Sequence, residues 1–273
     1  MSSPNDFIDI GSLPLLADHL RRGGKSVAHW KCGLEMELFG FRQSSLERID
    51  ASEVQAVLAS FAKEQDRRYY EKDTLTELCV ENLGHVTIEP GGQIEFSGRE
   101  KSSLTEMASD LSAFLTRLKE VAEQRNLIFL AAGFDPLRGI AEQRWFPKRR
   151  YNVLRPHLAS TGSRGWDMMT RTCAIQVSLD FDSESDWSKK FLLGNRLAPI
   201  ITAIFANSPF AEGNLSGYKS TRAAAWLQTD DARCGLAPLA LKDFVSFEDY
   251  VDYTLRAADD FHSPRRTLQG RAE

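Results

Sequence analysis

The sequence of 273 residues has little that would assign it to a membrane or secreted class. No run approaches the roughly 20 apolar residues of a membrane span. The N-terminus, MSSPNDFIDIGSL, has neither the basic nor the apolar region of a signal peptide. The four cysteines are scattered, form no CxxC pair and give no zinc spacing, which favours reduced thiols. These absences predict a cytoplasmic protein with no membrane partner.

Recognisable nucleotide, hydrolase and nucleic-acid signatures are also missing. The net charge is -4 and no basic stripe stands out, so we expect no nucleic-acid partner. There is no Walker motif, GxGxxG or kinase signature, and no GxSxG nucleophile elbow. GGKS, which starts at Gly23, has the end of a P-loop, but His19 occupies the upstream glycine position. The sequence does not indicate an oligomeric state.

The hydrophobic spacing that is present predicts helices and strands in mixed order. Expected helices cover residues 13–22, 51–64, 103–124, 151–158, 166–170, 189–206 (bent at Pro199), 221–227 and 247–257; expected strands cover 32–41, 76–80, 127–134 and 172–181, with a hairpin over 85–98 and a loop over 207–218. This order favours an α+β fold with a mostly antiparallel sheet flanked by helices. No linker divides the chain, so we expect a single domain over residues 1–257 and a polar tail over 258–273.

Two carboxylates lie two residues apart in the strand-like stretch CGLEMELFGF, which starts at Cys32. Residues i and i+2 of a strand share a face, so Glu35 and Glu37 point the same way. Glu89 and Glu95 flank the Pro-Gly-Gly turn of the expected hairpin, which can bring them together. A solvated strand face accounts for either pair taken alone.

Taken together, the four glutamates suggest a cation site. Inward carboxylates on adjacent strands repel one another and are costly unless paired or bound to metal. Hard oxygen ligands suit Mg²⁺ or Mn²⁺, and Mg²⁺ usually bridges a few carboxylates to phosphates. The pattern therefore indicates nucleotide-dependent chemistry, while a solvated face stays an equal alternative on pattern alone.

Several basic residues in the second half of the chain are candidates for binding. KRRY starts at Lys148, Arg171 lies in MMTRTC, and Arg222 precedes Trp226 by four residues, which places both on one face of a helix. Guanidinium groups suit bidentate recognition of carboxylates and phosphates. Surface ion pairing is the competing interpretation for each arginine.

Several of these stretches resemble a known family. CGLEMELFGF is similar to the GTEHEKFGF element, and VTIEPGGQIEFSG to the EPGGQFELSG element, of plant and proteobacterial glutamate–cysteine ligases. Met36 and Leu38 replace the more polar residues of that pattern. Further similar elements follow in the same order: FPKRRYNVLRPHL, GWDMMTRTCAIQVSLDF, AIFANSPFAEG, GYKSTRAAAW and FVSFEDYVDYTL. The resemblance runs from about Leu13 to about Leu255.

The resemblance implies a glutamine-synthetase-like carboxylate–amine ligase whose antiparallel sheet forms a funnel. The implied reaction is ATP-dependent ligation of the glutamate γ-carboxylate to the amine of cysteine through γ-glutamyl phosphate, for glutathione or ergothioneine synthesis. The implied roles are metal binding by Glu35, Glu37, Glu89 and Glu95, glutamate binding by Arg150, Arg222 and Trp226, catalysis by Arg171, and cofactor binding by Gln176. ATP and Mg²⁺ are the expected cofactors.

The end of the chain leaves two alternatives open. Family members continue beyond the VDYTL stretch, whereas the similarity here fades after about Arg256, which implies a C-terminally truncated homologue. One alternative is a ligase that uses another amine. The other is an inactive homologue that acts as a binding protein.

Overall fold

The computed structural model describes residues 13–259, which form two compact units. Unit 1 is drawn from residues 1–29, 180–198 and 236–273, and unit 2 from residues 30–179 and 199–235. Each unit is considered by itself. The expectation of one domain over residues 1–257 stays a prediction, and most of the expected polar tail lies outside the described residues.

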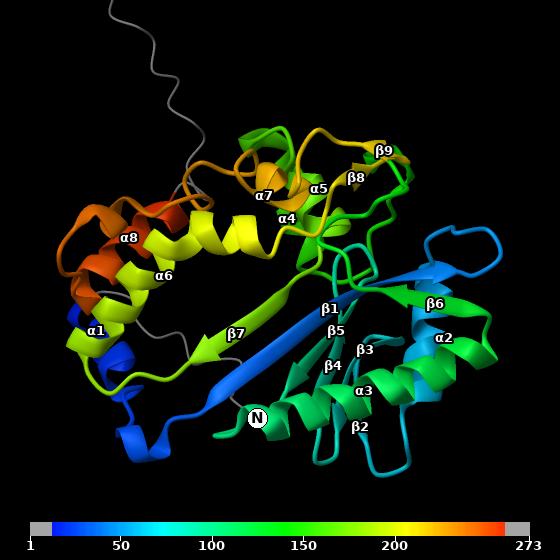
Figure 1. Ribbon diagram of the computed structural model, residues 1–273, viewed down its shortest axis with the longest axis horizontal. Coiled ribbons are helices and arrows are strands. Elements are labelled where there is room, and N and C mark those ends of the chain that lie inside the picture. The colour runs from blue at the N-terminus through cyan, green and yellow to red at the C-terminus, as the bar shows by residue number, and fades with distance from the viewer. Residues whose placement is uncertain (1–12, 260–273) are drawn as a thin grey trace, which may run out of the picture. The chain divides into compact units, whose positions relative to one another are not determined.

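Unit 2 contains a seven-stranded sheet in which every pair of neighbouring strands is antiparallel. The strand order is β2-β3-β4-β5-β1-β6, and β7 also pairs with β1. The strands are β1 (Cys32–Arg42), β2 (Arg67–Glu71), β3 (Thr74–Val80), β4 (Gly84–Ile88), β5 (Ile94–Gly98), β6 (Leu127–Leu130) and β7 (Ile175–Leu179). One edge of β1 pairs with β5, and the other pairs with β7 and then with β6. The long strand β1 is therefore the centre on which three others converge (Figure 1).

Two helices pack on one face of this sheet, α2 (Ala51–Phe61) and α3 (Leu104–Gln124) (Figure 1). Asp50 caps α2 and forms a capping box with Glu53, and Ser103 caps α3. Such caps satisfy backbone N–H groups that have no partner within the helix. The sequence therefore starts both helices where their apolar spacing also begins.

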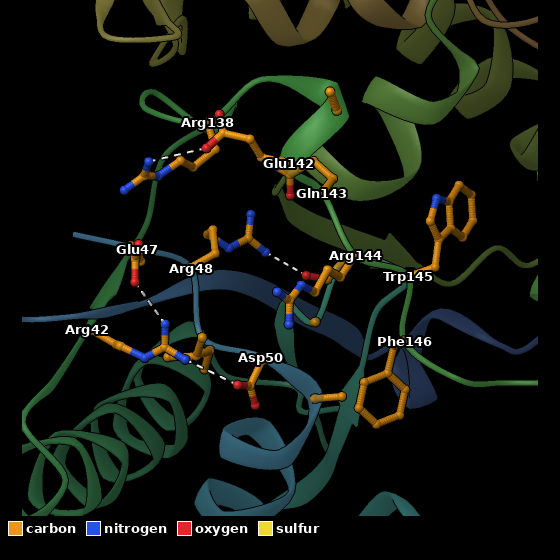
Figure 2. A pocket seen from close by; sticks show the side chains of 15 residues that line it. Arg42, Glu47, Arg48, Asp50, Arg138, Glu142, Gln143, Arg144, Trp145 and Phe146 are labelled. Atoms are coloured by element: carbon orange, nitrogen blue, oxygen red, sulfur yellow. Dashed lines mark hydrogen bonds and ion pairs between the residues drawn. The ribbon is translucent and has the colours of Figure 1, made fainter. Parts of the chain in front are cut away.

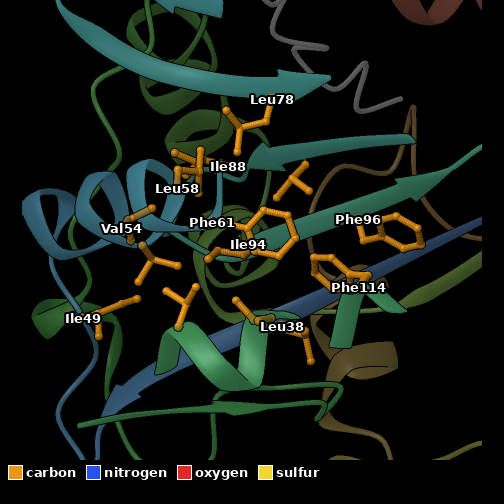
Figure 3. Packing of buried hydrophobic residues seen from close by; sticks show 14 of the residues in the cluster. Leu38, Ile49, Val54, Leu58, Phe61, Leu78, Ile88, Ile94, Phe96 and Phe114 are labelled. Carbon is orange, nitrogen blue, oxygen red and sulfur yellow. The ribbon is translucent and has the colours of Figure 1, made fainter. Parts of the chain in front are cut away.

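The main core of unit 2 lies between these helices and the sheet (Figure 3). Alternate strand residues such as Leu38, Ile94 and Phe96 point into it, because neighbours along a strand face opposite sides. Phe114 of α3 stacks on Phe96 with ring centroids 4.6 Å apart. Each such aromatic ring removes a large apolar area from water, so this face is the chief source of stability in the unit.

The other face of the sheet carries the polar side chains. Along β1, Glu35 and Glu37 alternate with core residues, and the same face continues into Phe39 and Phe41, which form a smaller cluster with Cys173. The carboxylates are thus half-buried rather than fully solvated.

The rest of unit 2 consists of short helices and a small hairpin. Helix α4 (Tyr151–Thr161) packs on α5 (Gly165–Arg171), which packs on α7 (Thr221–Trp226). The hairpin β8 (Phe210–Ala211) and β9 (Asn214–Leu215) falls in the stretch expected to be a loop. Its turn contains Glu212 and Gly213, both with positive φ, as two-residue hairpin turns of type I′ require. The apolar spacing of the sequence did not indicate this change of chain direction.

Unit 1 is helical in its described part. It contains the helices α1 (Leu13–Arg22) and α8 (Phe247–Asp259) and the 3₁₀ helices η1 (Val27–His29) and η3 (Pro238–Leu241). It also contains the part of α6 (Glu184–Ile204) up to residue 198. Trp187 contacts the rings of Phe191, Phe247 and Tyr250. Arg21 of α1 pairs with Glu248 of α8, so α1 and α8 are joined by packing and by charge.

Most expected elements are confirmed, with shifts at their ends. The strands β2, β8 and β9 were not expected, and β6 stops four residues before the expected end at Phe134. The helix expected to begin at Lys189 begins at Glu184. The prediction of an α+β fold with a mostly antiparallel sheet flanked by helices is confirmed. No helix within residues 13–259 combines the length and apolar character needed to cross a bilayer.

Candidate active site

Four glutamates gather on the polar face of unit 2, near its central strands. Glu37 of β1 lies directly opposite Glu95 of β5, and Glu35 lies opposite Ser97. Glu89 begins the turn between β4 and β5, where its N–H donates to the Gln93 carbonyl at 2.8 Å. The antiparallel register therefore brings together carboxylates that are up to 60 positions apart.

The tight packing of this turn fixes the position of Glu89. A Cβ added at Gly91 would lie 2.8 Å from the Cα of Thr170 in α5 and closer still to its carbonyl oxygen. The side chain of Gln93 is fully buried, and its amide donates to the carbonyl of Thr172 at 2.9 Å. The turn thus fits α5 only with glycine at this point, which explains Gly91 of the Pro-Gly-Gly sequence.

Burial and mutual repulsion perturb three of the carboxyl groups. The pKa of Glu37 is raised to about 7, first by burial and then by the charges of Glu89 and Glu95. The pKa of Glu89 is raised by burial and by Glu95, and the pKa of Glu35 is raised by the same two causes. Raised carboxyl pKa values of this kind are typical of functional sites. Ionised carboxylates in such surroundings lower the stability of the folded chain, so folding alone does not account for them.

The donors around these carboxylates satisfy them only in part. The Ala174 N–H donates to Glu37 at 2.8 Å, and Thr87 and Ser97 hydroxyls donate to Glu95 at 3.1 and 3.2 Å. Gln176 of β7 is exposed, lies opposite Glu35 and donates to Glu37 at 3.5 Å. The structure therefore places Gln176 beside the glutamates.

The donor set suits a divalent cation that also binds a ligand. A positive charge placed between carboxylates that repel one another stabilises their ionised forms. Within the part of the chain that the structure describes, no three His, Cys, Asp or Glu side chains are gathered closely enough to hold a metal ion alone. Mg²⁺ commonly takes one or two carboxylates together with water and phosphate oxygens.

Arg222 and Trp226 lie on the same helix, α7, as expected. The guanidinium carbon of Arg222 is 5.5 Å from the centre of the Trp226 ring. The charge of Glu37 raises the pKa of Arg222 and partly offsets the larger lowering by burial, so the two groups interact electrostatically. Arg222 Nε and Trp226 Nε1 are buried without a hydrogen-bond partner among the described residues.

Arg150 approaches the cluster from the start of α4. It is exposed, and its guanidinium carbon lies 5.1 Å from the ring of Tyr151. Its charge lowers the pKa of Glu89, against the larger effects of burial and of Glu95. Arg150 and Arg222 therefore provide positive charge near opposite members of the glutamate cluster.

Arg171 belongs to a different arrangement. Its buried guanidinium pairs with Asp167 at 2.8 Å and Glu212 at 3.4 Å, and lies 4.5 Å from the ring of Phe134. Its Nε and one Nη are buried without a partner among the described residues. The structure brings Arg171 to these acidic residues rather than to the four glutamates, and its expected catalytic role stays a prediction.

Two further residues of the FPKRRY stretch belong to the site. Lys148 donates to the Ile88 carbonyl at 2.6 Å, and the nearby Glu89 counters the lowering of its pKa by burial. Tyr151 is buried, and its hydroxyl has no partner among the described residues. Burial and the charge of Glu89 raise the pKa of Tyr151 beyond its ordinary value. The sequence feature that could have identified Lys148 and Tyr151 is their position in the same basic stretch as Arg150.

Comparisons with known proteins agree with the geometry. A chloroplastic glutamate–cysteine ligase of Nicotiana tabacum is 38% identical over 259 residues, which cover 93% of this chain and 49% of the relative. A chloroplastic glutamate–cysteine ligase A of Oryza sativa subsp. japonica is 39% identical over 241 residues, covering 88% and 49%. A chloroplastic glutamate–cysteine ligase of Arabidopsis thaliana is 36% identical over 259 residues, which cover 93% of this chain and 49% of the relative.

The chain spans about half the length of the curated relatives it matches. Their names state a chloroplast location, which does not support the cytoplasmic prediction for this chain. Residues 31–260 match the family described as Glutamate-cysteine ligase family 2 (GCS2), and this match includes all four glutamates and both arginines of the site. The chain therefore belongs to the glutamate–cysteine ligase family 2.

Proposed function

We propose that this chain provides the metal and glutamate sites of an ATP-dependent ligase that joins the γ-carboxylate of glutamate to the amine of cysteine. The observation that carries the proposal is the group of perturbed carboxylates, with Glu37 at a pKa of about 7, facing Arg222. Family membership and the names of the relatives support the same activity. The product would be γ-glutamylcysteine, a precursor for glutathione or ergothioneine synthesis.

The proposed metal ligands are Glu35, Glu37, Glu89 and Glu95. When bound, Mg²⁺ would neutralise charge between ATP phosphates and the attacking carboxylate. Because the described carboxylates do not form a complete ligand sphere, phosphate oxygens would supply the remaining positions. The raised pKa values imply that metal binding competes with protons at these glutamates.

The proposed glutamate site consists of Arg150, Arg222 and Trp226. Guanidinium groups pair well with carboxylates, and the unpartnered Nε of Arg222 and Nε1 of Trp226 are donors available to an acceptor. Positioning of this kind supplies much of the rate when two substrates must meet. Gln176 would contact the nucleotide from β7, and Arg171 would act through the turn that holds Glu212.

The chemistry needs no covalent intermediate on the protein. The γ-carboxylate of glutamate attacks the terminal phosphorus of ATP, which forms γ-glutamyl phosphate and releases ADP. The neutral amine of cysteine then attacks the acyl carbon, the amide bond forms, phosphate leaves with the bonding electrons, and the proton lost by the amine nitrogen passes to the released phosphate. The residues of this chain bind and orient the reactants for both displacements.

The test is phosphate release by the purified chain with ATP, Mg²⁺ and glutamate, with and without cysteine. We expect release that depends on cysteine, because the acyl phosphate is then consumed. Glu37→Gln should reduce the rate at least a hundredfold if the carboxylate orders the metal. Glu120→Gln, which changes an exposed carboxylate on α3 with the same chemistry, should leave the rate unchanged.

The alternatives give different results in the same assay. Release only with another amine would identify a ligase of different specificity. Binding of ATP without turnover would indicate a binding protein. A Glu37→Gln variant that folds and retains full activity would show that the assignment of the metal site is wrong.

A further inference from the structure

A hollow lies in unit 2 and is separate from the residues of the proposed active site. It has a volume of about 520 Å³ and is lined by three segments: residues 42–51 after β1, the turn residues Gly91 and Gly92, and residues 138–146 (Figure 2). None of the nine residues assigned to the proposed active site lines it. Its volume suits a small ligand up to the size of a nucleotide.

Arginines dominate the charged lining, and two of the four are neutralised by carboxylates that also line the hollow. Arg42 pairs with Glu47 and Asp50, both at 3.1 Å, and Arg138 pairs with Glu142 at 3.2 Å. These pairs occupy opposite parts of the lining in Figure 2. Their carboxylates would repel a ligand that carries many negative charges, but leave the space between them to the other two arginines.

Arg48 is held rigidly in the wall. About 10% of its side chain is exposed; one Nη donates to Asp135 at 3.0 Å and the other to the carbonyl of Gly91 at 2.7 Å. The guanidinium carbon lies 4.6 Å from the centre of the Phe39 ring. Its Nε is buried and has no hydrogen-bond partner among the described residues. A buried N–H without a partner costs on the order of 1–3 kcal/mol, and the positive charge of this guanidinium lies in the wall of the hollow.

Arg144 enters the same hollow from a different segment. Its side chain is exposed and makes no hydrogen bond or ion pair with another residue in the described range 13–259. In Figure 2 the guanidinium groups of Arg48 and Arg144 point toward the same part of the hollow. Arg138 adds a buried Nε that also has no partner among the described residues.

Among the described lining residues, the accessible cation without a partner is therefore Arg144, beside the guanidinium of Arg48 in the wall. A carboxylate offers two oxygens, whereas a phosphate group offers three or four and can accept from separate directions. The acidic pairs at the edges disfavour a long polyphosphate. A single phosphate group, alone or at the end of a small molecule, matches both features.

We propose that this hollow, the Arg48–Arg144 pocket, binds the phosphate group of a small molecule. Arg48 provides a fixed positive charge, since two of its nitrogens are already bound to Asp135 and Gly91, and Arg144 closes over the anion. The ligand is either free orthophosphate or a molecule that bears a terminal phosphate. The pocket shares Gly91 with the turn that carries Glu89, but its binding does not depend on the proposed ligase activity.

The test is calorimetric titration of the full chain, without Mg²⁺, with orthophosphate and separately with ADP. We expect saturable binding of at least one of them, and an affinity at least tenfold weaker in Arg144→Ala, as for loss of a charge-assisted hydrogen bond. Arg144→Lys keeps the positive charge but loses the planar guanidinium that can donate two hydrogen bonds to one group. Its affinity should therefore lie between those of the parent chain and Arg144→Ala. Binding of orthophosphate identifies the free ion as sufficient, and binding of ADP alone identifies the nucleotide.

Two controls make the result decisive. Arg144→Ala should unfold in urea at the same midpoint as the parent chain, because Arg144 is exposed and unpaired among the described residues. Lys119→Ala removes one exposed positive charge from α3, outside the pocket, and should bind as the parent does. Failure of both probes to bind, or equal affinity in Arg144→Ala and the parent, would overturn the proposal. Neither outcome depends on whether the chain turns over ATP.

Discussion

The raised pKa of Glu37 predicts that neutralising this residue stabilises the protein. The carboxyl has a pKa of about 7 in the folded chain, against an ordinary value of 4.5, because of burial and the charges of Glu89 and Glu95. Between these two values the folded state holds a proton that the unfolded state has lost. Stability therefore falls as pH rises through this window, since the unfolded state binds fewer protons.

The expected size of the effect follows from the same two values. At 1.36 kcal/mol per pH unit, the gap between 4.5 and about 7 corresponds to about 3 kcal/mol of unfolding free energy. This contribution is nearly absent at pH 4.5 and fully developed by pH 8. Gln has the same shape as Glu and still accepts from the Ala174 N–H, but it cannot ionise. Glu37→Gln should therefore gain about 3 kcal/mol over the parent chain at pH 8 and little at pH 4.5.

Urea unfolding of both chains at several pH values measures this difference directly. Glu120→Gln is the control, because it removes an exposed carboxylate whose loss should change stability by less than about 0.5 kcal/mol. Mg²⁺ should stabilise the parent at pH 8 more than it stabilises Glu37→Gln, since a ligand that binds only the folded state raises its stability. A parent and a Glu37→Gln variant with parallel pH profiles would refute the reasoning, because the cost of ionising Glu37 would then be absent.

Three other changes test packing, one at the turn beside the site and two elsewhere in the chain. Gly91→Ala should cost at least about 2 kcal/mol of unfolding free energy, because the new methyl group meets the backbone of Thr170; urea unfolding would show a lower midpoint, and an unchanged midpoint would contradict the close approach. Gly194→Ala in α6 meets nothing within 4 Å and should gain about 0.5–1 kcal/mol, seen as a higher midpoint in the same experiment. Arg117→Ala should cost about 3 kcal/mol and lower the melting temperature, because it leaves Asp66, whose side chain is 1% exposed, without its cation.

Local patterns were enough to predict the elements whose signals are local. The hairpin around Pro90 was predictable because turn residues lie between two β-rich pieces, and α3 because its apolar residues repeat over 21 residues. The strand β2, with the sequence RRYYE, was not predictable in this way. It lies at the edge of the sheet and most of its side chains are exposed, so it shows no alternation of apolar and polar residues.

The chemistry of the site depended on contacts that no local pattern contains. Spacing predicted that Glu35 and Glu37 share a face and that the hairpin can bring Glu89 and Glu95 together, and the resemblance implied that all four bind metal. The pKa of Glu37 also depends on a backbone N–H from Ala174 and on the charge of Arg222, which are more than 130 positions away. Such long-range terms appear only once the sheet and α7 are formed. The same holds for Arg48, whose partners lie 43 and 87 positions further along the chain.

The polar face of the sheet is hard to explain as a device for folding. Glu77, Thr87, Glu95 and Glu37 lie in register across four strands, and the last two, Glu95 and Glu37, repel each other. The opposite face of the same strands is filled with apolar side chains, so apolar residues would fit the architecture equally well. Carboxylates in this place lower stability at neutral pH. That cost is recovered only when positive charge arrives, and the cluster is therefore best understood as a binding surface that the apo protein holds under electrostatic strain.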